Sequence, residues 1–257
     1  MLEVHRYPLS DHGLDLPDPP IRLVGMLHEV AGLQKLVHGT VTPDPRSGRT
    51  ISMSEHDLTA MVSARLCHDL VSPLGAIGNG LELLELSSGG SGEEIALISD
   101  SLGSALAKLR FFRVAFGPAE SSARIRGEEV SAITDAMFSG RVTVVWSDLP
   151  DDVARPLIRL MFLAILCIEK SLPMGGAIRA SIAGDAGTLC VEGRRVAAPE
   201  DLWAHVTEGR PVENLRSDAV QFALLRHHLE ANEARLTAEL SETGATIMLG
   251  APATLPA

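Results

Sequence analysis

Apolar side chains recur every three or four residues along two consecutive stretches, and this period limits the fold more than any other feature of the sequence. The first stripe consists of Leu66, Leu70, Leu74, Ile77, Leu81 and Leu84. The second consists of Ile95, Ile98, Leu102, Ala105, Leu109, Phe112 and Phe116. Such spacing is typical of amphipathic α-helices. Because glycine and serine fill residues 87–92 between the stripes, we expect a helical hairpin.

Local signals also define the ends of the second helix. Ser91 followed by Glu94 forms a capping box that opens this helix, and Gly117-Pro118 ends it. Two helices bury a single apolar seam poorly. We therefore expect two hairpins to pair as a four-helix bundle in a homodimer.

The hydrophobic period changes after residue 118. Residues 119–126 are typical of a linker. Beyond them we predict helices at 130–138, 151–172, 199–208 and 218–231, and strands at 142–146, 177–183, 188–192, 235–240 and 246–249. Helices mixed with antiparallel strands in this order favour an α/β sandwich, so the fold class predicted for the whole chain is α+β.

These patterns divide the chain into five segments. Residues 1–52 are rich in proline and are predicted to be a poorly ordered extension with at most one short helix, at 21–37. The segments that follow are the hairpin at 53–118, the linker at 119–126, the α/β domain at 127–251 and a tail at 252–257.

Charge and cysteine content narrow the possible functions. A net charge of −11 argues against a broad basic surface for nucleic acid. The longest apolar run, residues 160–168, is far shorter than the ~20 residues that span a bilayer, and the N-terminus lacks the apolar core of a signal peptide. Three cysteines without a CxxC pair fit reduced thiols. We therefore expect a cytoplasmic protein without nucleic acid or membrane partners.

His68 lies on the face of the first helix that is opposite to the leucines. An α-helix turns about 100° per residue, which puts Arg65, Ser72, Gly75 and Asn79 on the same side as the imidazole. Ser72 and Gly75 are small, so the backbone of a partner protein can come close. We predict that these four residues form a docking surface around His68.

Asp69 follows His68 directly, and we predict a catalytic role for both residues. A carboxylate beside one imidazole nitrogen holds its N–H and fixes the tautomer. The other nitrogen then keeps its lone pair and can attack phosphorus. Pro73 has no N–H to donate to the Asp69 carbonyl and is expected to bend the helix, although a tolerated kink explains this proline equally well.

Ordinary explanations also exist for the other candidates. The chain has nine histidines, and a lone surface histidine usually has no catalytic role. Arg65 fits a solvated position equally well, and Asn79 fits an ordinary exposed polar position. Cys67 is interpreted as a core or boundary thiol because no base is placed to activate it. Consecutive His227 and His228 point to different faces of a helix and make a poor metal pair, so no metal site is predicted.

The segment His68-Asp69-Leu70-Val71-Ser72-Pro73-Leu74 resembles the H-box of sensor histidine kinases. In that family the motif lies on the first helix of a dimeric bundle, and residues 54–117 look like the whole dimerisation and phosphotransfer domain. The C-terminal region is similar, in its order of elements, to the ATP-binding domain of the same kinases. The resemblance therefore implies a phosphotransfer hairpin followed by a histidine-kinase ATPase-like α/β sandwich.

The second region departs from the kinases at three places where ATP should bind. Cys167 stands at the position of a magnesium-binding asparagine, and a thiol is a poor ligand for a hard ion. Residues 192–195 read Glu-Gly-Arg-Arg in place of an Asp-x-Gly-x-Gly adenine motif. Residues 218–224 have no glycine that would let the backbone approach a phosphate. We predict that this degenerate domain does not bind ATP.

A phosphotransfer hairpin joined to such a domain resembles the ChpT family of alphaproteobacterial histidine phosphotransferases. Residues 66–82 are a close match to the family, and the resemblance covers about residues 53–250. It implies that His68 takes a phosphoryl group from an aspartyl-phosphate on the receiver domain of a hybrid histidine kinase. His68 would then pass the group to response regulators in cell-cycle control. No cofactor would be bound here, because the receiver domain would supply Mg²⁺.

Two other functions stay open. The same H-box fits an atypical ATP-dependent sensor histidine kinase, which ATP alone would label. The chain also fits a non-catalytic dimeric docking scaffold, which would keep its activity in cells after the substitution His68→Gln.

Overall fold

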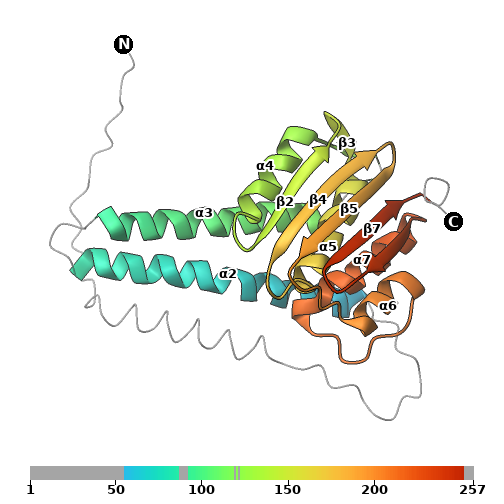
Figure 1. Cartoon of the computed structure of the whole chain (residues 1–257). Helices are drawn as coiled ribbons and strands as arrows, with labels where there is room; N and C mark the ends of the chain where they lie inside the picture. Colours follow the sequence, from blue (N-terminus) through green and yellow to red (C-terminus); the bar gives the residue numbers. More distant parts are fainter. Residues whose placement is uncertain (1–54, 87–91, 119, 121, 252–257) are drawn as a thin grey trace, which may run out of the picture. The chain divides into compact units, whose positions relative to one another are not determined.

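The computed structural model describes residues 55–86, 92–118, 120 and 122–251 (Figure 1). These residues belong to one compact unit. The extension predicted at 1–52 with its short helix, the capping Ser91, most of the glycine-rich turn and the tail predicted at 252–257 lie outside the described residues.

Two long helices confirm the predicted hairpin. Helix α2 spans Glu55–Leu86 and helix α3 spans Gly92–Ala115, and the two lie side by side (Figure 1). Their close approach requires a residue without a side chain at Gly80, because an added Cβ would lie 2.6 Å from Cγ1 of Ile98.

The apolar stripes of the hairpin are only partly buried within one chain. The last turns of α3 bury Phe111, Phe112, Val114 and Ala115. The exposed apolar side chains are Leu74, Leu81 and Leu83 of α2 and Ile95, Leu97, Leu102, Leu106 and Leu109 of α3, all between 42% and 58% exposed. A hairpin offers one seam, so the outer leucines remain open to solvent. The four-helix bundle of a dimer stays a prediction.

The sheet of the second region has five strands in the order β2-β4-β5-β7-β6. These strands are β2 (Val142–Asp148), β4 (Gly176–Ala183), β5 (Ala186–Gly193), β6 (Arg235–Leu240) and β7 (Gly244–Gly250). Three of the four strand pairs are antiparallel, as predicted. The pair β2–β4 is parallel, and here the prediction was wrong. A long helix connects these two strands, which is the crossover that a parallel pair requires.

That crossover helix, α5 (Arg155–Lys170), forms the centre of the core. Every residue from Leu157 to Ile168 is buried, because α5 contacts strands β5 and β7, helix α3, and helix α7 (Val220–Ala231). A helix that is buried on all sides needs such neighbours. Among the described residues, no helix combines the length and apolar character that crossing a membrane requires.

Helices α4 (Gly127–Met137) and α6 (Glu200–Glu208) lie within or near the predicted ranges, and a short 3₁₀ helix, η1 (Ser217–Ala219), precedes α7. Together, the hairpin and the mixed sheet with its helices confirm the predicted α+β class. The division of the chain at residues 119–126 stays a prediction.

The structure corrects two element boundaries. Strand β1 (Arg124–Arg126) lies within the predicted linker and pairs with β3 (Asp152–Ala154), which was predicted as the start of a helix. Helix α5 therefore begins only at Arg155, with Pro156 in its first turn. Proline favours that position because its missing N–H has no helical partner there.

Candidate functional site

His68 lies in the middle of α2, and its side chain is 59% exposed. Its Nδ1 is 3.0 Å from Oδ1 of Asp69, whose side chain is 16% exposed. A carboxylate only accepts hydrogen bonds, so the neutral ring donates its Nδ1–H to this oxygen. The assignment leaves the lone pair on Nε2 of an exposed imidazole, which is the arrangement that a nucleophile needs.

The second carboxylate oxygen of Asp69 accepts a hydrogen bond from Arg65. The Arg65 Nε lies 2.6 Å from Asp69 Oδ2, one helical turn away. The same guanidinium donates from Nη1 to the backbone carbonyl of Asp218 in η1, at 2.6 Å. A chain of hydrogen bonds thus runs from η1 through Arg65 and Asp69 to His68.

The side chain of Asp218 is also held in place. Lys170, in the last turn of α5, donates from Nζ to Oδ2 at 2.5 Å, and Arg216 donates from Nε to Oδ1 at 3.2 Å. Burial alone would raise the pKa of Asp218, but the hydrogen bonds and charges of Lys170 and Arg216 outweigh it and lower this pKa. The Asp218 carboxylate therefore stays ionised and connects α5 with η1 beside the hairpin.

The backbone carbonyl of Asp69 has an unusual partner. Pro73 has no N–H, so the helix cannot supply the donor that this carbonyl normally receives four residues later. Lys108 of α3 donates instead, with Nζ 3.0 Å from the Asp69 oxygen. The chain stays helical from Glu55 to Leu86 through Pro73, and the predicted bend stays a prediction.

A second carboxyl group, that of Glu169 in α5, lies near the same charges. Burial raises the pKa of Glu169, while the positive charges of Arg65, Arg141 and Lys108 oppose this shift and the charge of Asp69 adds to it. Glu169 therefore lies within electrostatic reach of the charges around Asp69, and Asp69 is the carboxyl group that contacts the histidine.

The four residues predicted to form a docking surface fall into two groups. Ser72 and Asn79 are exposed and Gly75 is half-buried; an added Cβ at Gly75 would meet no atom within 4 Å. The surface near His68 is thus open and formed by small side chains. Arg65 differs, since its side chain is only 15% exposed and points into the chain. A docking role for all four residues stays a prediction.

Other candidate residues lie away from this arrangement. Cys67 is an exposed free thiol, so its interpretation as a core or boundary thiol was wrong. His228 of α7 accepts a hydrogen bond at Nδ1 from Arg159, at 3.3 Å, which supports a structural role. Within the part of the chain that the structure describes, no group of three or more His, Cys, Asp or Glu side chains could hold a metal ion.

Large side chains fill the space between α5, α6 and α7. Cys167 is fully buried, and burial raises the pKa of its thiol well above the usual value. Trp203 donates from Nε1 to Oγ of Ser171 at 3.0 Å and meets the ring of Phe222 edge-on, with 5.6 Å between the ring centroids. This packing stabilises the helices and leaves the Cys167 thiol without access to solvent.

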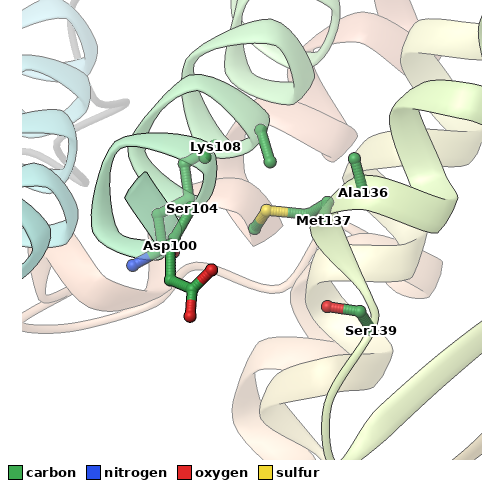
Figure 2. A pocket seen from close by; sticks show the side chains of 8 residues that line it. Asp100, Ser104, Lys108, Ala136, Met137 and Ser139 are labelled. Carbon is green, nitrogen blue, oxygen red and sulfur yellow. The ribbon is translucent and has the colours of Figure 1, made fainter. Parts of the chain in front are cut away.

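A separate groove of about 380 Å³ lies between α3 and α4 (Figure 2). It is lined by Asp100, Gly103, Ser104, Ala107, Lys108, Ala136, Met137 and Ser139. His68 does not line this groove, and the Lys108 ammonium is engaged with the Asp69 carbonyl. Among the residues that line the groove, only Lys108 contacts a residue next to the histidine, so the groove is separate from the site around His68.

Comparison with known proteins identifies the class. Residues 126–244 match the family model of the histidine phosphotransferase C-terminal domain. The chain is 31% identical over 179 residues to protein phosphotransferase ChpT of Brucella abortus (strain 2308), a match that covers 66% of this chain and 84% of the relative. A solved structure of a bacterial phosphotransferase is similar with a TM-score of 0.68 and 25% identity, covering 78% of this chain and 98% of that one.

The fold and these matches define a histidine phosphotransferase. The chain belongs to the ChpT family of protein phosphotransferases. This match confirms the resemblance to the ChpT family. That resemblance was inferred from the H-box together with the departures from the kinase motifs. The family model begins at residue 126, so it covers the second region and not His68.

Proposed function

We propose that this chain is the histidine intermediate of a multistep phosphorelay. His68 takes a phosphoryl group from an aspartyl-phosphate on the receiver domain of a hybrid histidine kinase. It then transfers the group to the aspartate of a response regulator. The observation that carries this proposal is the 3.0 Å contact between Nδ1 of the exposed His68 and Asp69 Oδ1, because it leaves the Nε2 lone pair available for attack.

The transfer step needs no proton movement at the histidine. As the bond between Nε2 and phosphorus forms, the bond between phosphorus and the donor aspartate breaks, and its electron pair returns to that carboxylate. Nδ1 keeps its proton, so the phosphorylated ring is positively charged and the Asp69 carboxylate balances this charge. Attack by a second receiver aspartate reverses these bonds and returns the lone pair to Nε2.

Mg²⁺ for this reaction is proposed to come from the receiver domain, and no ATP is used. The burial of Cys167 supports the absence of ATP use, because a buried neutral thiol is a poor ligand for Mg²⁺. Phe222 supports the absence of ATP use as well, because it stands in the segment that lacks the phosphate-loop glycine and is buried against the ring of Trp203. In this proposal the second region stabilises and orients the hairpin.

The proposal includes a homodimer whose hairpins form a four-helix bundle. Its support is the set of exposed leucine and isoleucine side chains on the neighbouring helices α2 and α3, because large apolar surface left exposed in one chain is typical of an interaction site. Receivers would dock on the surface formed by Ser72, Gly75 and Asn79. We further propose that the relay acts in the cytoplasm, where three free cysteines stay reduced, and that it serves cell-cycle control.

The test is phosphotransfer from a purified receiver domain that carries radiolabelled aspartyl-phosphate. We expect acid-labile, alkali-stable label on this chain, no label on His68→Ala, and normal labelling of the control His205→Ala, which removes a histidine of α6. Label on His68→Ala would exclude His68 as the acceptor. Labelling by ATP alone would favour a kinase, and full activity of His68→Gln in cells would favour a scaffold.

A further inference from the structure

Arg65 connects two regions of the chain that are far apart in sequence. Its Nε donates to Asp69 Oδ2 and its Nη1 donates to the carbonyl of Asp218, both at 2.6 Å. The two partners belong to α2 and η1, and 153 residues separate Arg65 from Asp218. With 15% of its side chain exposed, Arg65 presents little of its guanidinium to a partner protein.

We propose that Arg65 is a positioning residue of the phosphotransfer site, which holds the Asp69 carboxylate against His68 and is itself anchored on the C-terminal region at the Asp218 carbonyl. The inference rests on the proposed function of His68. It assigns Arg65 an internal role in place of the docking role that the sequence suggested.

The geometry explains why an arginine serves here. The planar guanidinium carries several N–H donors in fixed directions, so one side chain can hold two acceptors at a set angle. With Oδ2 fixed by Arg65, the other oxygen of Asp69 stays directed at Nδ1 of His68. Without this contact the carboxylate can adopt other rotamers, and the imidazole loses the partner that fixes its tautomer.

The anchor for Arg65 is itself rigid. Asp218 is tied to α5 by Lys170 Nζ, 2.5 Å from Oδ2, and Lys170 belongs to the last turn of the buried helix at the centre of the core. The hydrogen bonds therefore extend from α5 through η1 and Arg65 to the histidine. This gives the C-terminal region a direct part in the geometry of the site, in addition to its packing against the hairpin.

The experiment loads the full chain with phosphoramidate, a small donor that needs no receiver. The imidazole attacks phosphorus, the N–P bond of the donor breaks and ammonia leaves. We expect Arg65→Met to load about 10- to 100-fold more slowly than wild type, the range that misplacement of a reacting group costs. The control Arg113→Met, an exposed arginine of α3, should load at the wild-type rate.

A second measurement follows the tautomer by nitrogen NMR of the His68 ring. Wild type should show a protonated Nδ1 and an unprotonated Nε2, and Arg65→Met should show a mixture of tautomers. If Arg65→Met does not fold, Arg65→Lys replaces it, since one ammonium cannot hold both acceptors in the geometry of a planar fork. Wild-type loading with an unchanged tautomer in the folded variant would overturn the inference.

The outcomes separate this inference from the proposed function. If wild type does not load, or if His68→Ala loads equally well, the proposed function fails. If wild type loads on His68 and Arg65→Met loads at the same rate, only the positioning role fails. Slow transfer from a receiver combined with normal loading by phosphoramidate would show that Arg65 docks partners, and it would also overturn the inference.

Discussion

At the scale of single residues, Asp69 links the parts of the site, because each of its three oxygens has a different partner. Oδ1 accepts from His68, Oδ2 accepts from Arg65, and the backbone oxygen accepts from Lys108. These partners belong to two helices, and Arg65 extends the connection to η1. A residue held at three points has one orientation, so the imidazole beside it would need little reorganisation before the proposed transfer.

The substitution Asp69→Asn tests the tautomer argument. An asparagine of the same size can donate from its amide to Nδ1, which moves the ring proton to Nε2 and removes the lone pair there. We expect phosphoryl transfer to His68 to be about 100-fold slower or more. The measurement is the rate of labelling from a phosphorylated receiver, with circular dichroism to establish folding.

The matched control for Asp69→Asn is Asp100→Asn, which alters an exposed carboxylate on the neighbouring helix α3 and should transfer at the wild-type rate. Wild-type transfer by folded Asp69→Asn would contradict the role given to the carboxylate.

The sequence reveals part of this site and conceals the rest. His68 and Asp69 could be predicted because they are adjacent, and a helical period sets their face. Pro73 also predicts a carbonyl without its helical donor. The identity of that donor could not be predicted, because Lys108 lies 39 residues away and only the packing of α3 on α2 brings it there. The inward orientation of Arg65 likewise depends on tertiary packing.

At the scale of elements, the contact between Lys108 and the Asp69 carbonyl joins α3 to α2. Lys108→Met leaves this half-buried carbonyl without a donor, which should lower the free energy of unfolding by about 1–3 kcal/mol. Pro73→Ala restores a backbone N–H four residues after Asp69. In the Pro73→Ala background we therefore expect Lys108→Met to lower the free energy of unfolding by a clearly smaller amount. Urea unfolding of the four proteins measures the coupling, and equal costs in both backgrounds would contradict this account.

The contact between α5 and α7 predicts a loss of stability in acid. Burial, together with the charges of Arg159 and His227, lowers the pKa of His228 from 6.5 to about 4. Between these two values the unfolded chain binds a proton that the folded chain excludes, so stability falls as the pH decreases from about 6.5 to about 4. His228→Asn keeps an acceptor near Nδ1 without titrating there. We expect this variant to lose less stability over the same interval, as measured by urea unfolding.

The elements themselves were predictable to different degrees. Periods of three and four residues are sufficient for α2 and α3, because the helices are long and their faces differ. Strand β3 was missed because three residues carry no period, and its pairing with β1 is a long-range contact. The parallel pair β2–β4 depends on the path of α5 across the sheet, which local sequence does not encode.

At the scale of the whole molecule, the exposed leucines predict the oligomeric state. Leu81 of α2 is 50% exposed and Leu102 of α3 is 48% exposed. Burial of a leucine contributes about 1.5–3 kcal/mol, so the seam of a four-helix bundle would gain several such terms. We expect the wild-type chain to sediment as a dimer at micromolar concentration. The double variant Leu81→Glu, Leu102→Glu should sediment as a monomer, because carboxylates cannot be buried at the seam without partners.

The control for this double variant is Ser99→Glu, which adds one glutamate at an exposed polar position of α3 and should leave the dimer intact. Phosphorylation of His68 by phosphoramidate shows whether loss of the dimer also affects the reaction at the histidine. His68, Asp69 and Arg65 all belong to one chain, so a folded monomer should still load at close to the wild-type rate. A wild-type chain that sediments as a monomer would contradict the four-helix bundle and require another explanation for the exposed leucines.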